Sequence, residues 1–328
     1  MKKLICICLI FCLLLTLASC SATETSTQSF FLMDTVITVT LYTSTKVAEP
    51  IFMQCRAILE ELDALWSRTK GESDVCRFNA SSDGISDADA RTFHLISTAL
   101  EVTTKTDGAF DITVAPLVTL WQSCAEEDRL PNEAELDACL QIVGAQNLTL
   151  TDGGICKSES RVQMNLGGIG KGAAISILIN YLNTCAITGG LVSFGSNVAV
   201  FGSKPDGSSF RIALRDPTQD SGIAGTLLLG DGEVLSVSGD YERYHTIGGE
   251  RYHHILDPAT GYPSQSGLTS VAVICRDGAL ADALSTALFV MGIDAAMEFY
   301  ASGVFDFEAI FIASDGTVTA THDGLLQN

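Results

Sequence analysis

Helix-like and strand-like stretches follow one another in blocks along this chain, and this order limits the folds open to it. Apolar residues recur with helical spacing in four stretches, residues 48–67, 88–105, 132–143 and 277–291. Strand-like patterns fill residues 184–274 between Gly/Asp/Ser turns, and two more strands are expected over residues 307–321. Blocks of this kind, without regular strand–helix–strand alternation, are typical of the α+β class. We therefore expect mixed sheets with packed helices in a single large domain.

Local signals place several boundaries. Residues 30–42 are rich in valine and threonine with partial alternation, which predicts one first strand. Asp87 is the expected N-cap of the helix over residues 88–105. Residues 161–166 are expected to form a short strand that runs into a glycine-rich turn and then into a helix ending near Thr184.

The N-terminus has the pattern of a targeting signal. A basic start, Met1-Lys2-Lys3, precedes an apolar run over residues 4–17 that is too short to span a bilayer. Leu17-Ala18-Ser19-Cys20 is similar to a bacterial lipobox, in which Cys20 receives the lipid; the alternative is an ordinary cleaved signal peptide. We expect a signal peptide over residues 1–19, a lipidated cysteine and flexible tether over residues 20–29, and a folded domain over residues 30–328. The protein would then be extracytoplasmic and lipid-anchored to a bacterial membrane.

The net charge and the cysteine spacing argue against nucleic-acid binding, a disulfide framework and a thiolate metal site. Lys and Arg number 19 against 39 Asp and Glu, so the formal charge of −20 argues against nucleic-acid binding. An anionic ligand would meet a repulsive field unless a metal ion or local cations intervene. Of the 11 cysteines, seven follow Cys20, and none of them forms a C-x-x-C pair. We expect buried free thiols and neither a disulfide framework nor a thiolate metal site.

Residues 164–172, MNLGGIGKG, form the first segment with potential chemistry. Glycines allow a backbone to approach a ligand closely, and the N-terminus of a following helix favours an anion. The segment is not a Walker loop, because Asn165 stands where that motif needs glycine and Gly172 where it needs Ser or Thr. A Rossmann site is weakly supported, since no acidic residue follows about 20 residues later. A tight strand-to-helix turn without a ligand remains an equal alternative.

The helix over residues 277–291 brings Asp282 and Thr286 to one face, four residues apart. A carboxylate and a hydroxyl are oxygen ligands suited to Mg²⁺. Taken alone, the pair is better explained by a solvated Asp282 and a Thr286 hydroxyl bonded back to its own helix.

Two histidines form the third candidate. His253 and His254 are adjacent, so in a strand they face opposite sides and cannot easily share a metal. One of them is a candidate general base and the other is expected to be structural. Surface histidines without a role are the plainer alternative. A fourth segment, residues 107–121, joins Gly, acid and aromatic residues to a helix that Pro116 could start, and a packed corner would explain it equally.

Together, in this order and at this spacing, the four segments resemble the FAD:protein FMN transferase family, the ApbE-like flavin transferases. Further matching pieces are residues 31–35, 73–79, 195–197 and 288–292, so the resemblance covers nearly all of the mature chain. It implies the T-fold-related ApbE fold. It also implies Mg²⁺-dependent transfer of FMN from FAD to a threonine hydroxyl of a target flavoprotein, with release of AMP. The alternatives are an FAD pyrophosphatase that gives FMN and AMP, and a non-enzymatic, lipid-anchored FAD-binding protein.

The resemblance also implies roles, residue by residue. Asp282, Thr286 and the carbonyl of Gly168 match metal ligands, and His254 matches a histidine that assists hydroxyl attack. The positions that match contacts to FAD are Met33, Thr69, Ala109, Phe110, Asp111, Asn165, Lys171 and Ile255.

Two features bear on how this chain differs from relatives and from their targets. Asn165 stands where relatives usually carry Asp, which removes a negative charge near the metal and is expected to weaken Mg²⁺ binding. Acceptor sites in targets resemble Asp-Gly-Ala-Thr. Here the Asp-Gly-Ala sequences at residues 107–109 and 277–279 are followed by Phe and Leu, so the chain resembles the transferase and not its target.

Overall fold

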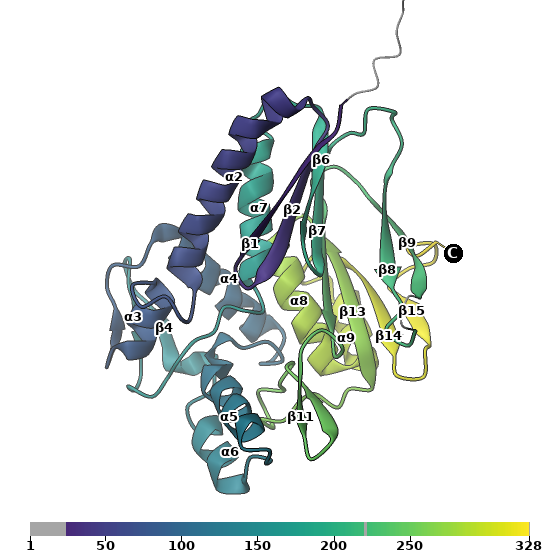
Figure 1. Ribbon diagram of the computed structural model, residues 1–328. Coiled ribbons are helices and arrows are strands. Elements are labelled where there is room, and N and C mark those ends of the chain that lie inside the picture. Colours follow the sequence, from purple (N-terminus) through teal and green to yellow (C-terminus); the bar gives the residue numbers. More distant parts are fainter. Residues whose placement is uncertain (1–23, 220–221, 328) are drawn as a thin grey trace, which may run out of the picture.

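A computed structural model describes residues 24–219 and 222–327 and centres on one antiparallel sheet (Figure 1). Each strand of this sheet is antiparallel to its neighbours. In their order across the sheet, the strands are β1 (Ser26–Leu32), β2 (Thr35–Leu41), β6 (Gly189–Phe194), β7 (Asn197–Gly202), β10 (Val234–Gly239), β13 (Leu268–Cys275), β14 (Glu308–Ala313) and β15 (Val318–Ala320).

Helices cover one face of this sheet and enclose the main core (Figure 1). They are α2 (Thr45–Trp66), α4 (Ala90–Lys105), α7 (Gly170–Leu182), α8 (Gly278–Met291) and α9 (Ile293–Ala301). The amphipathic α2 buries one stripe, including Cys55, Leu59 and Leu62, as helical spacing predicts. In contrast, α8 packs against α7, β10 and β13 together, so it is buried almost all round.

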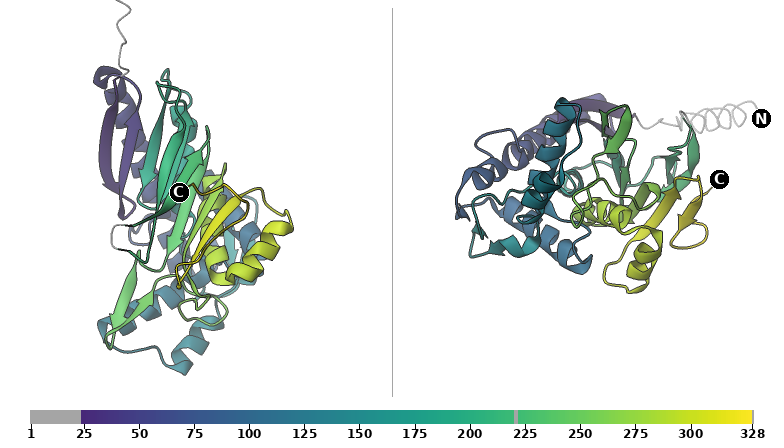
Figure 2. Two further views of the ribbon diagram at one scale, coloured as in Figure 1. Left: turned by 90° about the vertical axis from the view of Figure 1, so that its right-hand side faces the viewer. Right: turned by 90° about the horizontal axis from the view of Figure 1, so that it is seen from below.

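The hairpin of β8 (Phe210–Arg215) and β9 (Ile223–Leu229) covers part of the opposite face (Figure 2). A second apolar cluster, which includes Phe210, Leu227 and Ile274, fills the space between this hairpin and the sheet. The two apolar layers explain why strands such as β13 are buried on both faces.

A third apolar cluster lies where α5 (Ala115–Glu126) and α6 (Glu133–Leu140) meet the hairpin of β11 (Tyr244–Ile247) and β12 (Glu250–His253), at the bottom of Figure 1. The indole N–H of Trp121 donates to the carbonyl of Gly261 (2.8 Å) and joins the two parts. The remaining elements are α3 (Asp74–Ala80), a small sheet of β3 (Gly84–Ile85), β5 (Ile155–Lys157) and β4 (Leu148–Leu150), and the 3₁₀ turns η1 (Ile112–Val114) and η2 (Ala145–Asn147). Strand β3 packs against α3.

The α+β class with mixed sheets and packed helices in a single domain is confirmed, but the predicted first strand is wrong. Residues 30–42 instead contain the end of β1, a two-residue turn at Met33 and Asp34, and the antiparallel strand β2. Both turn residues have positive φ, 53° and 56°, as a type I′ turn requires. The sequence lacks the Asn-Gly signal that normally reveals such a turn. Strand β1 also begins at Ser26, inside the stretch expected to be a tether.

Two further local expectations need correction. Helix α4 begins at Ala90 with Asp89 as its N-cap, whereas Asp87 forms an ion pair with Arg77. Residues 161–166 form no strand and run as irregular chain, held by side-chain bonds and not by a neighbouring strand.

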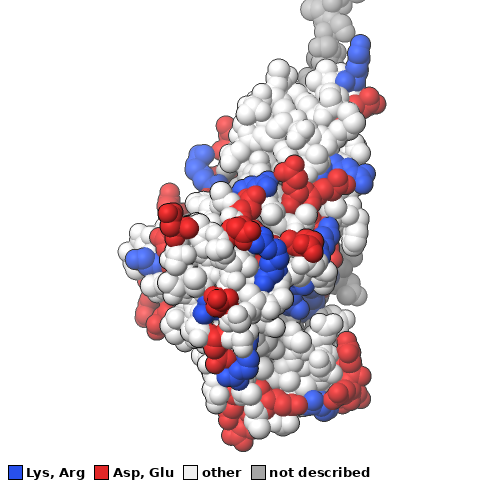
Figure 3. All heavy atoms as spheres, turned by 90° about the vertical axis from the view of Figure 1, so that its left-hand side faces the viewer, with Lys and Arg blue, Asp and Glu red and all other residues white. Residues whose placement is uncertain are grey.

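The described residues contain no helix long and apolar enough to cross a membrane. The expected signal peptide and Cys20 lie outside the described residues. On the face that Figure 3 shows, acidic side chains are interspersed with basic ones, and no extended basic surface is visible there.

Candidate functional site

A cavity of about 580 Å³ opens among the glycine-rich turn, α8, the β1–β2 turn and the β11–β12 hairpin. Its volume is in the range of small-molecule and cofactor sites. Twelve predicted site residues from widely separated segments line it together: Met33, Thr69, Ala109, Phe110, Asp111, Asn165, Gly168, Lys171, His254, Ile255, Asp282 and Thr286. A larger cavity of about 700 Å³, between α4 and α7, contains none of them.

The glycine-rich turn serves both the cavity and helix packing. A Cβ atom at Gly168 would lie 3.1 Å from the Phe110 ring and 3.6 Å from Oγ1 of Thr286, so a side chain there would crowd the cavity. At Gly172, the third residue of α7, a Cβ would collide with the carbonyl of Gly278 in α8. Gly168 therefore keeps the cavity open, and Gly172 allows α7 and α8 to cross closely.

Asp282 is a buried carboxylate at the cavity wall, only 4% exposed. The Gly172 N–H donates to Oδ2 (2.9 Å), the Ser236 hydroxyl donates to Oδ1 (3.0 Å), and Nζ of Lys171 lies 3.7 Å from Oδ1. Since Gly172 is in the first turn of α7, Asp282 satisfies a helix N–H that has no partner within its own helix. The expectation of a solvated Asp282 is therefore wrong.

Thr286 lies one turn after Asp282. Its Oγ1 is 3.2 Å from Oγ of Ser238 and 3.5 Å from the carbonyl of Asp282, so the predicted back-bond to its own helix is long. The described residues contain no cluster of three His, Cys, Asp or Glu side chains suited to a metal. One carboxylate, one hydroxyl and one carbonyl still form a donor set suited to Mg²⁺, which completes its shell with water and phosphate oxygens.

His254 lies beside Arg243 in the cavity lining. Its Nδ1 is 3.0 Å from the carbonyl of Arg243, and because a carbonyl only accepts, Nδ1 carries the proton and Nε2 the lone pair. The ring reaches solvent through the cavity mouth, yet surrounding protein excludes enough water to lower the pKa of His254 to about 4. The nearby charges of Arg243 and Lys171 lower this pKa further, so the imidazole is neutral at pH 7.

His253 does not line the cavity. Its Nε2 is 3.0 Å from the carbonyl of Ser264, and its ring packs edge-on against Phe289. Burial lowers its pKa. The two adjacent histidines therefore have different surroundings, as their alternation in a strand predicts.

Asp111 and Asn165 present polar groups to the same cavity. Burial raises the pKa of Asp111, whose Oδ1 accepts bonds from the N–H (2.7 Å) and hydroxyl (2.6 Å) of Thr113. Oδ1 of Asn165 accepts the N–H of Gly167 (3.0 Å), and Nδ2 has no hydrogen-bond partner within the described part of the chain. Asn165 therefore presents a donor to a ligand.

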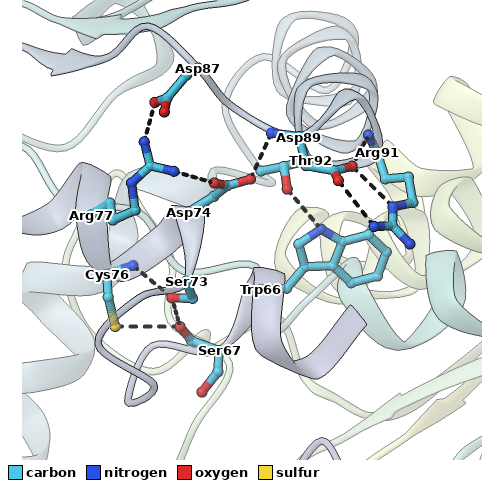
Figure 4. A network of polar contacts seen from close by, with 10 residues as sticks. All are labelled: Trp66, Ser67, Ser73, Asp74, Cys76, Arg77, Asp87, Asp89, Arg91 and Thr92. Carbon is cyan, nitrogen blue, oxygen red and sulfur yellow. Dashed lines mark hydrogen bonds and ion pairs between the residues drawn. The ribbon is translucent and has the colours of Figure 1, made fainter. Parts of the chain in front are cut away.

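A polar network holds Ser67, which lines the cavity and directly precedes Arg68 and Thr69 in the chain (Figure 4). Ser73, the N-cap of α3, donates its hydroxyl to the carbonyl of Ser67 (2.6 Å). The thiol of Cys76 donates to the same carbonyl (3.5 Å). Trp66, which lines the cavity just before this wall, donates its indole N–H to Oγ1 of Thr92 (3.2 Å). The loop that carries Thr69 is thus held from outside the cavity.

The other end of α3 holds the glycine-rich turn. Nδ2 of Asn79 donates to the carbonyl of Met164 (3.0 Å), and Oδ1 accepts the N–H of Met164 (2.8 Å). The N–H of Asn165 donates to the carbonyl of Ile112 (2.7 Å). The side chain of Asn79 therefore makes the backbone hydrogen bonds that a neighbouring strand would otherwise make to this segment.

Sequence reasoning missed several cavity residues. Ser238 lines the cavity, and Ser236, two residues earlier in β10, donates its hydroxyl to Asp282; the period of two in a strand could have revealed this pair. Arg68 and Arg243 lie in loops, where no periodicity marks them. In total the lining holds five carboxylates and three cations: Asp34, Asp63, Asp111, Glu242 and Asp282 against Arg68, Lys171 and Arg243.

The fold and cavity define a nucleotide-sized binding site in an α+β domain, and residues 33–311 match the sequence profile of the ApbE family. The FAD:protein FMN transferase of Vibrio cholerae is 32% identical over 239 residues, which are 72% of this chain and 71% of the relative. The FAD:protein FMN transferase of Escherichia coli K12 is 33% identical over 250 residues, 73% of this chain and 70% of the relative.

Solved structures agree. The apo flavinyl transferase ApbE of Pseudomonas stutzeri superposes with a TM-score of 0.81 at 30% identity, covering 93% of this chain and 98% of that one. The ApbE protein of Thermotoga maritima gives a TM-score of 0.82 at 30% identity, with coverage of 91% and 97%. The chain belongs to the ApbE family, and the family expected from its motifs is confirmed.

Proposed function

We propose that this protein transfers the FMN half of FAD to a threonine hydroxyl of a target flavoprotein, with Mg²⁺, and releases AMP. The observation that carries the proposal is the convergence of all twelve predicted site residues on one cavity. The family relatives named FAD:protein FMN transferase support the same reaction.

In this reaction the threonine oxygen attacks the phosphorus of the FMN half. A new O–P bond forms, the bond from that phosphorus to the bridging oxygen breaks, and AMP leaves with the oxygen. The threonine proton passes to Nε2 of His254, whose lone pair is available because Nδ1–H is bonded to the carbonyl of Arg243. The diphosphate is negative, so its arrival would raise the pKa of His254 and make it a stronger base.

The charges of the lining fit a site that also takes a divalent cation. Five carboxylates and three cations leave an excess of negative charge, to which FAD adds a diphosphate. We propose that Asp282, Thr286 and the carbonyl of Gly168 hold Mg²⁺. The metal would neutralise charge on the diphosphate oxygens and orient the leaving group. Lys171, 3.7 Å from Asp282, adds a fixed positive charge beside them.

The remaining residues would bind and orient FAD. The apolar surfaces of Met33, Phe110 and Ile255 suit the flavin ring, and Thr69 and Ala109 complete the walls. Asn165 would donate from Nδ2 to an acceptor of the adenine or ribose, where a carboxylate could only accept. Asp111 is held in place by Thr113 and presents its carboxyl group to the same space.

The test is product analysis with FAD, Mg²⁺ and a target domain that contains Asp-Gly-Ala-Thr. A Mg²⁺-dependent FMN adduct on the threonine, with one AMP per adduct, is expected. AMP with free FMN and no adduct would support the pyrophosphatase instead. Bound FAD without turnover would support the FAD-binding protein.

We also propose that Cys20 is lipidated and holds the protein on the outer side of a bacterial membrane. The support is the lipobox-like sequence over residues 17–20. Cys20→Ser is expected to move the protein from the membrane fraction to the soluble fraction. An unchanged membrane fraction would contradict the lipid anchor.

A further inference from the structure

Two large apolar side chains are exposed side by side on the β1–β2 hairpin. Phe31 is 73% exposed and Val36 is 57% exposed, and they are directly opposite each other in the register. Elsewhere on this face the opposed pairs are polar and bonded to each other, Thr27 with Thr40 (3.1 Å) and Ser29 with Thr38 (2.9 Å). Single apolar side chains on a surface are common and need no explanation. Two of them paired across neighbouring strands, on a face whose other pairs are Ser and Thr, break the polar pattern of that face.

This pair flanks the β1–β2 turn, and the turn itself borders the cavity. Residues 33–35, the turn and first β2 residue between Phe31 and Val36, line the cavity. Another part of the rim carries Tyr244 of β11, which is 48% exposed and lies under the guanidinium of Arg251 at 3.9 Å. Three arginines stand at or beside the cavity without an ion-pair partner among residues 24–219 and 222–327, namely Arg68, Arg243 and Arg251.

The proposed function places a requirement on this rim. A threonine that belongs to a folded protein can reach the cavity only if the segments around it touch the rim. We propose that Phe31, Val36 and Tyr244 form the docking surface for the target flavoprotein; this inference rests on the proposed function. The fitting partner carries an apolar side chain next to its acceptor threonine and a carboxylate that faces Arg243 or Arg251. The lining as a whole has more carboxylates than cations, so the attraction for such a carboxylate is local to Arg243 and Arg251, which form no ion pair within the described part of the chain.

The apolar pair lies near the end of the hairpin that carries the turn. Strand β1 starts at Ser26, and Phe31 follows five residues later, so it lies roughly 17 Å from the N-terminal end of the strand. In Figure 1 the N-terminal end of β1 lies toward the top, the β1–β2 turn about halfway down and β11 near the bottom. The N-terminal end of β1 therefore lies at the other end of the strand from Phe31.

The test compares the double variant Phe31→Ser, Val36→Thr with the wild-type protein. The new residues match the Ser/Thr pairs of the same face, so the hairpin keeps its pattern. The matched control is Ile223→Thr on β9, a residue that is 62% exposed and does not line the cavity. Initial rates of FMN adduct formation are measured against the concentration of a purified target domain that contains Asp-Gly-Ala-Thr, with FAD and Mg²⁺ saturating.

The double variant is expected to raise KM for the target domain at least about tenfold, as loss of a central apolar contact does at other interfaces. Its kcat, FAD affinity and thermal unfolding temperature should match those of the control. An unchanged KM would overturn the docking surface while leaving the transferase intact. A fall in vesicle binding, or in self-association, with no change in KM would assign the pair to a membrane or to a second copy. If the wild-type protein itself forms no adduct, the proposed function fails and the docking surface fails with it.

Discussion

Asp282→Asn removes one negative charge from the cavity wall and keeps almost the same shape. In the wild-type protein, Asp282 accepts bonds from the N–H of Gly172 and the hydroxyl of Ser236. The amide of Asn can accept from Gly172 with its oxygen and donate to Ser236 with its nitrogen, because a hydroxyl both donates and accepts. Both bonds can therefore survive the substitution.

The structure separates the cost to stability from the cost to activity. Loss of the partly exposed pair with Lys171 should lower the free energy of unfolding by about 1 kcal/mol or less. Asp282→Ala, by contrast, leaves two buried donors without acceptors, at about 1–3 kcal/mol each. Changing a residue that hydrogen-bonds to a metal ligand typically lowers metal affinity about 10–100-fold. Replacing the ligand Asp282 itself should lower the affinity for Mg²⁺ at least as much.

The assay is FMN adduct formation as a function of Mg²⁺ concentration, together with thermal unfolding. Asp277→Asn is the matched control, because it makes the same chemical change at the N-cap of the same helix and outside this cavity. We expect Asp282→Asn to need far more Mg²⁺ at nearly unchanged stability, and Asp277→Asn to behave as wild type. A normal Mg²⁺ titration for a folded Asp282→Asn would refute the assignment of Asp282 as a metal ligand.

Four further predictions concern the base, the glycine-rich turn and its support. His254→Ala should lower kcat by about 10²–10⁴-fold, the usual contribution of general base catalysis, with unchanged FAD affinity in a fluorescence titration; full activity would assign the base elsewhere. Because water exclusion lowers the pKa of His254 to about 4 in the protein without FAD, its neutral form persists below pH 6, so kcat/KM for FAD should fall only near pH 4, and a fall centred near 6.5 would contradict this. Asn165→Asp adds a carboxylate beside the metal and should lower the Mg²⁺ concentration for half-maximal rate; an identical titration would argue against a position near the metal. Asn79→Ala removes both bonds to the backbone of Met164, so it should destabilise the fold by about 1–3 kcal/mol and raise KM for FAD more than it lowers kcat, as steady-state kinetics and thermal unfolding can show.

Much of the fold could be predicted because apolar periodicity survives tertiary packing. The stripe of α2 and the extent of α8 follow from apolar spacing alone. The β1–β2 turn could not be found in this way, since Met33 and Asp34 adopt positive φ without the glycine that usually permits it. The surrounding hairpin and cavity wall determine that conformation, and they are not local features.

The candidate site was predictable only as a combination of motifs. Spacing alone favoured a solvated Asp282, because the sequence does not show that α7 and β10 bury it. The partners that change this conclusion, Gly172 and Ser236, lie 110 and 46 residues away in the sequence. No single segment identified the site, whereas the order and spacing of all four segments indicated the family and, through it, the site residues. Arg243 has no such context, and only the fold brings its carbonyl to His254.

The central claim is that this cavity moves FMN from FAD to a threonine. Intact-protein and peptide mass spectrometry of a target domain, incubated with the protein, FAD and Mg²⁺, tests it most directly. We predict an FMN adduct on the acceptor threonine that requires Mg²⁺, appears with an equal amount of AMP and is lost when the threonine is replaced by alanine. AMP and free FMN with an unmodified threonine would contradict the claim.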